Sequence, residues 1–184
     1  MRAEQTLLHD CYIIHDHLIS DDRGFFFESF NEKKFADATG LHIHFVQDNQ
    51  SRSKKGVLRG LHYQKGHHSQ AKLVRVLRGK VIDVAVDLRK SSPTFGQTFS
   101  IELTDSSNTQ LFIPRGFAHG FVVLSDTADF FYKCDNFYNK EADGGIIYND
   151  AHLNIDWKLP ATQLLISEKD ALLPVFDINE TIFE

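Results

Sequence analysis

The sequence predicts a mainly β domain, either a sandwich or a closed barrel, and three observations support this. Short runs rich in Val, Ile, Phe and Leu recur between turn signals along most of the chain. Phe accounts for 16 of the 184 residues, and aromatic side chains favour pleated, half-buried surfaces. Only two short segments have the pattern of a helix. The length suits one domain, which we place over residues 1–184.

The apolar runs predict ten strands, at the spacing expected of a sandwich or barrel. Gly79 stands between two of them with charged neighbours, as expected of a tight hairpin turn. The predicted strands are Tyr12–Leu18, Gly24–Phe30, His42–Gln50, Gly56–Tyr63, Ala71–Arg78, Lys80–Asp87, Thr98–Leu103, Gln110–Ile113, Gly120–Leu124 and Ala128–Lys133.

Two short helices are predicted from their end signals. Asn31 is suited to cap a helix over Glu32–Thr39, which Gly40 would end in a left-handed conformation. Ser167 is suited to cap a turn that starts at Glu168. The segment 138–160 is rich in Gly, Asn and Asp, so we expect it to be mostly loop.

Composition and charge argue against several classes of protein. A net charge of -5 and a pI near 6.0 do not provide the basic surface that nucleic-acid binding requires. Residues 1–10 lack an apolar signal-peptide core, and nowhere do about 18 apolar residues run together, so we expect neither secretion nor membrane insertion. Cys11 and Cys134 belong to no CxxC pair, so we expect no disulfide framework and a cytoplasmic location.

The densest polar cluster covers residues 47–53 and is followed at once by a histidine-bearing strand. In an extended strand Gly60, His62 and Gln64 share one face, so His62 and Gln64 are expected to look into one cavity. His62 is either a base that titrates near neutral pH or a histidine hydrogen-bonded inside a barrel. This stretch leaves both interpretations open.

In the next predicted strand, side chains alternate between inward-facing and outward-facing positions, and Lys72 is the first on the inward-facing side. An inward lysine is costly to desolvate unless an anion or oxyanion compensates it, which suggests a binding role. The alternative is that this first strand residue points to solvent.

Two further candidates lie downstream. Pro114 and Gly116 predict a rigid turn that places His119 at the mouth of the following strand. Tyr132 shares a strand face with Phe130. A buried tyrosine is more often a core residue with a satisfied hydroxyl than a catalytic group, so the pattern leaves its role open.

Asp170 also has two interpretations. The sequence Ser167-Glu168-Lys169-Asp170 fits a capping-box-like helix start, which would explain the acid structurally. Alternatively, Asp170 orients the imidazole of His62 and stabilises its charged form. The same oxygens cannot fully serve both roles.

A metal site is not predicted. His15-Asp16-His17 and His42-Ile43-His44 match the first half of a His-x-His site, but neither is followed at short range by the remaining ligands. Alternating residues in a strand give the same pattern by chance. His67-His68 lies in a polar loop, where we expect exposure to solvent. We therefore expect no metal and no cofactor.

Taken together, several motifs resemble one family. The chain is similar to the dTDP-4-dehydrorhamnose 3,5-epimerases, cofactor-independent cupins of deoxysugar biosynthesis, from about residue 21 to residue 174. The motifs that carry the resemblance, in family order, are Asp22-Arg23-Gly24-Phe25-Phe26-Phe27-Glu28, Gln47-Asp48-Asn49, Arg59-Gly60-Leu61-His62-Tyr63-Gln64, Lys72-Leu73-Val74, Asp83-Val84-Ala85-Val86-Asp87-Leu88-Arg89 and Pro114-Arg115-Gly116-Phe117-Ala118-His119-Gly120-Phe121.

The resemblance implies a cupin or jelly-roll barrel with a few short helices, and it implies site roles. His62 matches the proton acceptor, Tyr132 the proton donor and Asp170 the partner of His62. Lys72 matches a residue near the sugar's carbonyl oxygen. The positions that match substrate-binding residues are Arg23, Glu28, Gln47, Asn49, Arg59, His119 and Lys169.

Two positions differ from the family pattern. Asp143 replaces a Glu in the loop after the donor tyrosine, so we expect it to bind substrate in that Glu's place. Phe137 replaces a Tyr of some relatives, which leaves stacking but no hydroxyl contact. The family also implies a homodimer in which N-terminal strands cross to the partner and residues near Arg23 complete the neighbouring site.

The expected reaction is 3,5-epimerisation of dTDP-4-dehydro-6-deoxy-D-glucose to dTDP-4-dehydro-L-rhamnose. It proceeds by proton abstraction and reprotonation beside the C4 ketone. The alternatives are a related 3-epimerase or 3,4-ketoisomerase, a metal-dependent cupin and a non-catalytic sugar-nucleotide-binding cupin. The expected partners are a sugar nucleotide and a second copy of the chain, without nucleic acid or membrane.

Overall fold

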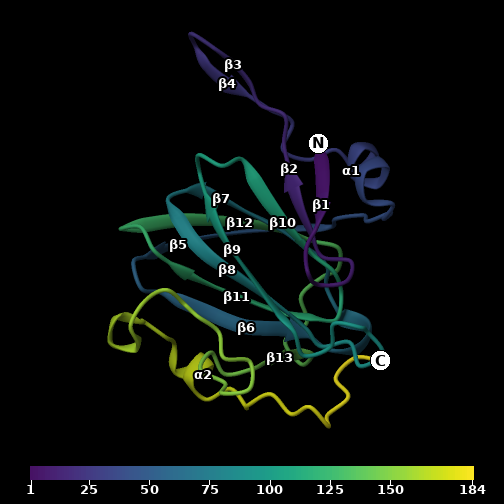
Figure 1. Cartoon of the computed structure of the whole chain (residues 1–184), viewed down its shortest axis with the longest axis vertical. Coiled ribbons are helices and arrows are strands. Elements are labelled where there is room, and N and C mark those ends of the chain that lie inside the picture. The colour runs from purple at the N-terminus through teal and green to yellow at the C-terminus, as the bar shows by residue number, and fades with distance from the viewer.

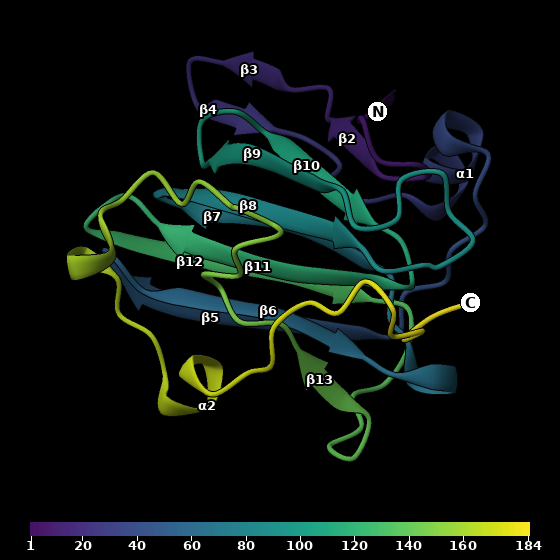
Figure 2. The same cartoon turned by 60° about the horizontal axis from the view of Figure 1, so that its bottom comes forward.

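The computed structural model describes residues 1–184, and its main strands form two β-sheets that face each other (Figures 1 and 2). The six-stranded sheet has the order β1 (Arg2–Gln5), β2 (Tyr12–His15), β10 (Thr109–Ile113), β7 (Lys72–Arg78), β12 (Thr127–Cys134), β5 (Gln47–Lys54). The five-stranded sheet has the order β13 (Asp143–Gly145), β6 (Leu58–Gln64), β11 (Phe117–Val123), β8 (Lys80–Asp87), β9 (Thr98–Thr104).

All pairings within the two sheets are antiparallel, and the mainly β prediction is confirmed. The bounds of β8 agree with the predicted strand. Those of β7, β9 and β10 differ by one residue at one end, and those of β6 and β12 by one or two residues at both ends. The prediction for His42–Gln50 is largely wrong, because β5 begins at Gln47 and the preceding residues form no strand. The short strands β1, β13 and β3 (Ile19–Asp21) were not predicted, because they have little apolar periodicity and depend on pairing with neighbours.

The hairpin predicted at Gly79 is also wrong. The strands on either side of it, β7 and β8, belong to different sheets, so the turn carries the chain from one sheet to the other. Gly79 has a φ of 84°, and a Cβ atom there would lie 2.2 Å from the backbone oxygen of Thr127. The turn therefore needs glycine, although it joins no paired strands.

The main core fills the space between the sheets. Side chains alternate across β7, so that Val74 and Val76 face this core while Leu73 faces the opposite side. There Leu73 packs in a smaller cluster with Phe35 of helix α1 (Glu32–Thr39). Strand β8 is buried along almost its whole length, because residues from the C-terminal third of the chain, such as Trp157, cover its other face.

Both predicted helix starts are confirmed. Asn31 caps α1 by accepting a hydrogen bond from the backbone N–H of Lys34, and Gly40 ends the helix with a φ of 75°. Ser167 caps the one-turn helix α2 (Glu168–Ala171) through its side chain. Neither helix has the length and hydropathy needed to cross a lipid bilayer.

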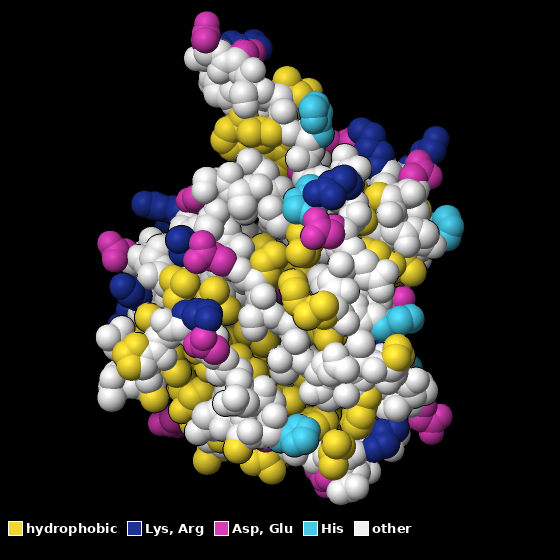
Figure 3. All heavy atoms as spheres, in the orientation of Figure 1, with side chains coloured by type: hydrophobic (Ala, Val, Ile, Leu, Met, Phe, Trp, Pro, Cys, Tyr) yellow, Lys and Arg dark blue, Asp and Glu magenta, His cyan; other side chains and the backbone are white.

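A separate two-stranded hairpin, β3 with β4 (Gly24–Phe26), projects away from the barrel (Figure 1). Its apolar side chains Ile19, Phe25 and Phe26 are all more than half exposed. Hydrophobic atoms are visible at this projection in the space-filling view (Figure 3). The hairpin therefore offers an apolar surface that the chain itself does not cover.

Candidate active site

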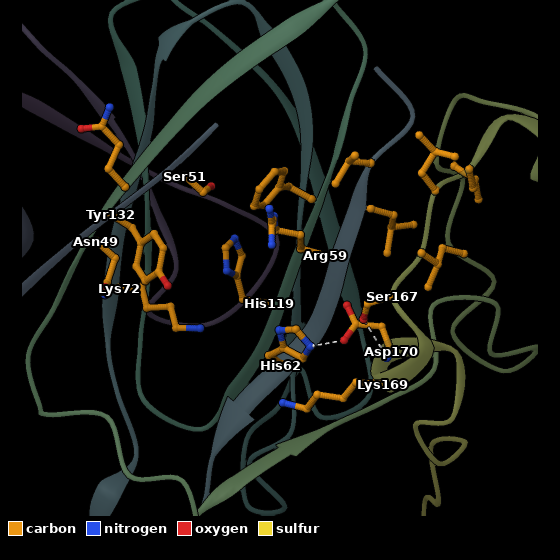
Figure 4. Close-up of a pocket in the computed structure, with 17 residues that line it drawn as sticks. Asn49, Ser51, Arg59, His62, Lys72, His119, Tyr132, Ser167, Lys169 and Asp170 are labelled. Carbon is orange, nitrogen blue, oxygen red and sulfur yellow. Dashed lines mark hydrogen bonds and ion pairs between the residues drawn. The ribbon is translucent and has the colours of Figure 1, made fainter. Parts of the chain in front are cut away.

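A cavity of about 900 Å³ opens between the two sheets, and the C-terminal segment forms one of its walls (Figure 4). It brings together most of the predicted site residues. Those that line it are Asn49, Arg59, His62, Lys72, His119, Tyr132, Lys169 and Asp170. Its volume is in the range of small-ligand sites.

The two sheets contribute different groups to this cavity. His62 on β6 and His119 on β11 are cross-strand partners in the five-stranded sheet. Lys72 on β7 and Tyr132 on β12 belong to the six-stranded sheet. In the close-up, Tyr132 and His62 lie across the cavity from each other, with the Lys72 ammonium between them (Figure 4). A ligand in the cavity would thus meet histidine on one side and tyrosine on the other.

His62 is held by a carboxylate that lies far away in the sequence. Its Nε2 is 2.9 Å from Oδ1 of Asp170, whose Oδ2 accepts a hydrogen bond from the backbone N–H of Gly60 at 3.1 Å. The cap of α2 is formed instead by the Ser167 hydroxyl, which accepts from the backbone N–H of Asp170. The capping explanation for the Asp170 carboxylate is therefore wrong, and both of its oxygens are engaged with the histidine strand.

This environment favours an uncharged imidazole that can accept a proton. Burial lowers the pKa of His62 from its ordinary value, while the Asp170 carboxylate raises it. With Nε2 hydrogen-bonded to Asp170, the lone pair of the neutral ring lies on Nδ1. The Asp170 carboxylate would also stabilise the imidazolium that forms when His62 takes up a proton.

Tyr132 and Lys72 have complementary properties. Burial raises the pKa of Tyr132 to about 12, so its phenol keeps its proton at neutral pH. The Lys72 Nζ lies 5.9 Å from the centre of the Tyr132 ring. Burial lowers the pKa of Lys72, as expected of an ammonium facing an interior. The prediction that Lys72 faces inward is confirmed, and the solvent-facing alternative is wrong.

Two supporting residues were not singled out for their chemistry in the sequence. Asp83, fully buried on β8, accepts from or shares a proton with His119 Nε2 at 2.9 Å. An aspartate in the middle of the apolar run 81–86 was the available signal, because burying a charge there requires a partner. Ser53 accepts two hydrogen bonds from the Arg59 guanidinium, at 3.2 and 3.3 Å, and so orients it.

Four predicted substrate-binding residues do not line the cavity of this chain. Arg23 lies at the tip of the β3–β4 hairpin, with its side chain 89% exposed and bonded to Asp21. Glu28 bonds to Lys34 at 2.7 Å. Gln47 accepts from the backbone N–H of Tyr138 at 3.1 Å, beside the exposed Phe137. Asp143 bonds to Gln64 and to Lys169, of which only Lys169 lines the cavity.

The histidines considered for a metal site do not assemble one. No three histidine, cysteine or acidic side chains form a group that could hold a metal ion. His15 instead contacts Glu4 at 3.1 Å, and His44 lies 3.5 Å from Glu32. The ring centres of His67 and His68 are 4.0 Å apart. His67 is exposed as predicted, but His68 is only partly exposed and lies 3.2 Å from Nδ2 of Asn139.

A neutral imidazole and a protonated phenol on opposite walls, with a cation between them, suit the transfer of protons to and from the two faces of one ligand. The fold and site thus define a β-barrel protein equipped for acid–base chemistry on a small molecule.

The chain belongs to the dTDP-4-dehydrorhamnose 3,5-epimerase family, whose model matches residues 5–177. The enzyme of that name from Shigella flexneri is 52% identical over 170 residues, which cover 92% of this chain and 93% of the relative. The family's cupin barrel is the fold observed here.

Solved structures agree over nearly the full length. The dTDP-4-dehydrorhamnose 3,5-epimerase of Elizabethkingia anophelis is 58% identical, with a TM-score of 0.93 and 96% coverage of both chains. The dTDP-6-deoxy-D-glucose-3,5-epimerase of Legionella pneumophila, solved in complex with dTDP-4-keto-L-rhamnose, is 49% identical. Its TM-score is 0.90, with 95% of this chain and 92% of the other covered.

Proposed function

We infer that this chain is an isomerase that epimerises dTDP-4-dehydro-6-deoxy-D-glucose at carbons 3 and 5, giving dTDP-4-dehydro-L-rhamnose. The observation that carries this inference is the placement of the His62–Asp170 pair and Tyr132 on facing walls of one cavity, in a member of the epimerase family. Inversion at a carbon requires the proton to leave from one face and return to the other. Two groups on opposite walls meet this requirement.

The C4 ketone acidifies the protons on the neighbouring carbons 3 and 5. His62 takes such a proton, and Asp170 stabilises the resulting imidazolium. The negative charge that develops on the ketone oxygen is stabilised by Lys72, whose ammonium lies between the two proton-transfer groups. Tyr132 then delivers a proton to the opposite face of the ring. Because its pKa is raised, the phenol stays protonated at neutral pH.

The remaining cavity residues bind the substrate in this proposal. Arg59 is suited to a diphosphate, because a guanidinium can bind phosphate oxygens through two parallel hydrogen bonds. Asn49, His119 and Lys169 contribute further polar contacts. Gln47 accepts a hydrogen bond from the backbone of Tyr138, which follows the stacking candidate Phe137 in the sequence.

We further propose a homodimer in which the β3–β4 hairpin reaches the partner's cavity. Its exposed apolar side chains are suited to burial, and neither Arg23 nor Glu28 lines the cavity of its own chain. In this arrangement Arg23 and Glu28 serve the neighbouring site. We also propose that the enzyme acts in the cytoplasm, where its free and buried Cys11 and Cys134 would stay reduced.

The test is to incubate the purified protein with the 4-keto sugar nucleotide in heavy water and to follow the product by proton NMR. We expect deuterium at both carbon 3 and carbon 5, together with formation of the L-rhamno product. Deuterium at carbon 3 alone would indicate a 3-epimerase. Binding without exchange would indicate a non-catalytic sugar-nucleotide-binding protein.

A further inference from the structure

A buried amide joins the histidine strand to the wall of the cavity. Gln64 lies two residues after His62 on β6 and is only 5% exposed. Its side-chain oxygen accepts a hydrogen bond from the backbone N–H of Asn139 at 2.8 Å, and its Nε2 donates to Asp143 Oδ1 at 3.1 Å. Gln64 therefore faces inward as its strand parity predicts, but it binds protein groups and does not line the cavity.

Asp143 is the next residue in this hydrogen-bond network. It stands directly opposite Gln64 in the pairing of β13 with β6, which sets the position of its carboxylate. The second carboxylate oxygen, Oδ2, accepts a hydrogen bond from the Lys169 ammonium. Both oxygens of Asp143 are thus engaged within the protein, and its side chain is only 16% exposed.

Of the three residues in this hydrogen-bond network, Lys169 is the one that faces the cavity. Its side chain is 61% exposed and lines the wall next to Asp170. A lysine on a mobile four-carbon stem has many rotamers, so a free Lys169 would lose conformational entropy whenever it engaged a ligand. The bond to Asp143 removes part of that freedom in advance. Asp143 also raises the pKa of Lys169, which keeps the ammonium charged.

We propose that Gln64 and Asp143 are positioning residues that act through Lys169. They hold its ammonium at the cavity wall and thereby raise the affinity for the sugar nucleotide without touching it. This role rests on the proposed function, and it gives Asp143 a different task from the direct substrate contact expected from the family pattern. The proposal predicts that loss of Asp143 and loss of Lys169 are not additive.

A double-mutant cycle in steady-state kinetics separates the two roles. Asp143→Asn keeps the size of the side chain and an acceptor for Gln64, but removes the charge that holds Lys169. We expect KM to rise about tenfold, as for one lost charge-assisted contact, with kcat within about twofold of wild type. When Asp143→Asn is added to Lys169→Met, the KM of the double mutant should equal that of Lys169→Met alone.

Two more variants complete the kinetic test. Asp143→Glu keeps the carboxylate and should retain a KM close to that of the wild type. Gln64→Met removes the amide but keeps the length, and should raise KM in the same direction as Asp143→Asn. A matched control is Asp156→Asn, which breaks the bond of an exposed aspartate to Lys158 away from the cavity and should leave KM unchanged.

The proposal is overturned if Asp143→Asn raises KM equally in both backgrounds, which would mean direct substrate contact, or if it leaves KM unchanged. A test without turnover uses lysine side chains labelled by reductive ¹³C-methylation. The NMR titration of Lys169 should show a lower pKa in Asp143→Asn than in wild type. An equal pKa in both would refute the proposal that Asp143 holds the Lys169 ammonium. Failure of the proposed function would appear separately, because the wild-type protein would then not incorporate deuterium at both carbon 3 and carbon 5.

Discussion

The Nε2 atom of His62 lies 2.9 Å from Oδ1 of Asp170, although the two residues are 108 positions apart in the chain. The contact joins β6 of the barrel to the short helix α2 that follows the C-terminal wall of the cavity. Because Asp170 also accepts the backbone N–H of Gly60, its carboxylate is fixed at two points. The imidazole is therefore oriented before any ligand enters.

Removal of the imidazole should abolish proton abstraction. In His62→Ala we expect the incorporation of solvent deuterium at both carbons to fall by about 10²–10⁴-fold, the usual contribution of a general base. The measurement is proton NMR of the sugar nucleotide in heavy water. His67→Ala, which alters an exposed histidine outside the cavity, is the control and should exchange normally. Near-normal exchange in His62→Ala would refute the base assignment.

The pH dependence follows from the charge state of His62. Burial lowers its pKa below the ordinary 6.5, and only the neutral ring accepts a proton, so kcat/KM should be lost as pH falls through a value under 6.5. Asp170 raises this pKa. In Asp170→Asn the loss of kcat/KM at acidic pH should therefore occur at still lower pH. The maximal kcat/KM should fall as well, because the imidazolium loses its partner. A shift of this acidic loss to higher pH would contradict this account.

The phenol of Tyr132 should matter for inversion more than for abstraction. In Tyr132→Phe we expect deuterium exchange to continue while net epimerisation is lost, because protons then return from the face they left. NMR reports both quantities in one experiment. Tyr12→Phe, on the far face of the six-stranded sheet, serves as a control. Equal loss of exchange and epimerisation would count against a donor role for Tyr132.

Lys72 should act mainly on the rate. Lys72→Met keeps the length of the side chain but removes its charge, so the enolate loses its stabilising cation. We expect kcat to fall by about 10²–10³-fold, as for the loss of one preorganised stabiliser. Lys80→Met is the matched control, since Lys80 also begins a strand but pairs with Glu102 at the surface. A change in KM alone would assign Lys72 to binding instead.

Subunit mixing tests whether the hairpin completes the neighbouring site. Arg23→Ala and His62→Ala should each be inactive alone. A 1:1 mixture that exchanges subunits should recover about a quarter of wild-type activity, because half of the dimers are mixed and each has one intact site. Size-exclusion chromatography should show a dimer. If no activity returns although mixed dimers form, Arg23 serves its own chain's site.

Much of the site chemistry could be predicted from local patterns. Strand parity placed His62 and Lys72 on inward-facing rows, and both side chains line the cavity. The prediction that Gln64 looks into the same cavity is wrong, because its amide binds Asn139 and Asp143 instead. The roles of Asp170 and Tyr132 could not be decided in the same way. A capping pattern and a catalytic carboxylate look alike in sequence, as do a core tyrosine and an acid.

The sequence by itself determined the local structure: the alternation along the strands, the caps at Asn31 and Ser167, and the residue types available for proton transfer. These depend on side chains and hydrogen bonds within a few residues of each other. Only the tertiary structure decided that β7 and β8 lie in different sheets, that Asp170 reaches His62 and that Tyr132 faces them both. Such relationships arise when distant strands pair and two sheets close over a common core, and no local pattern specifies which partners meet.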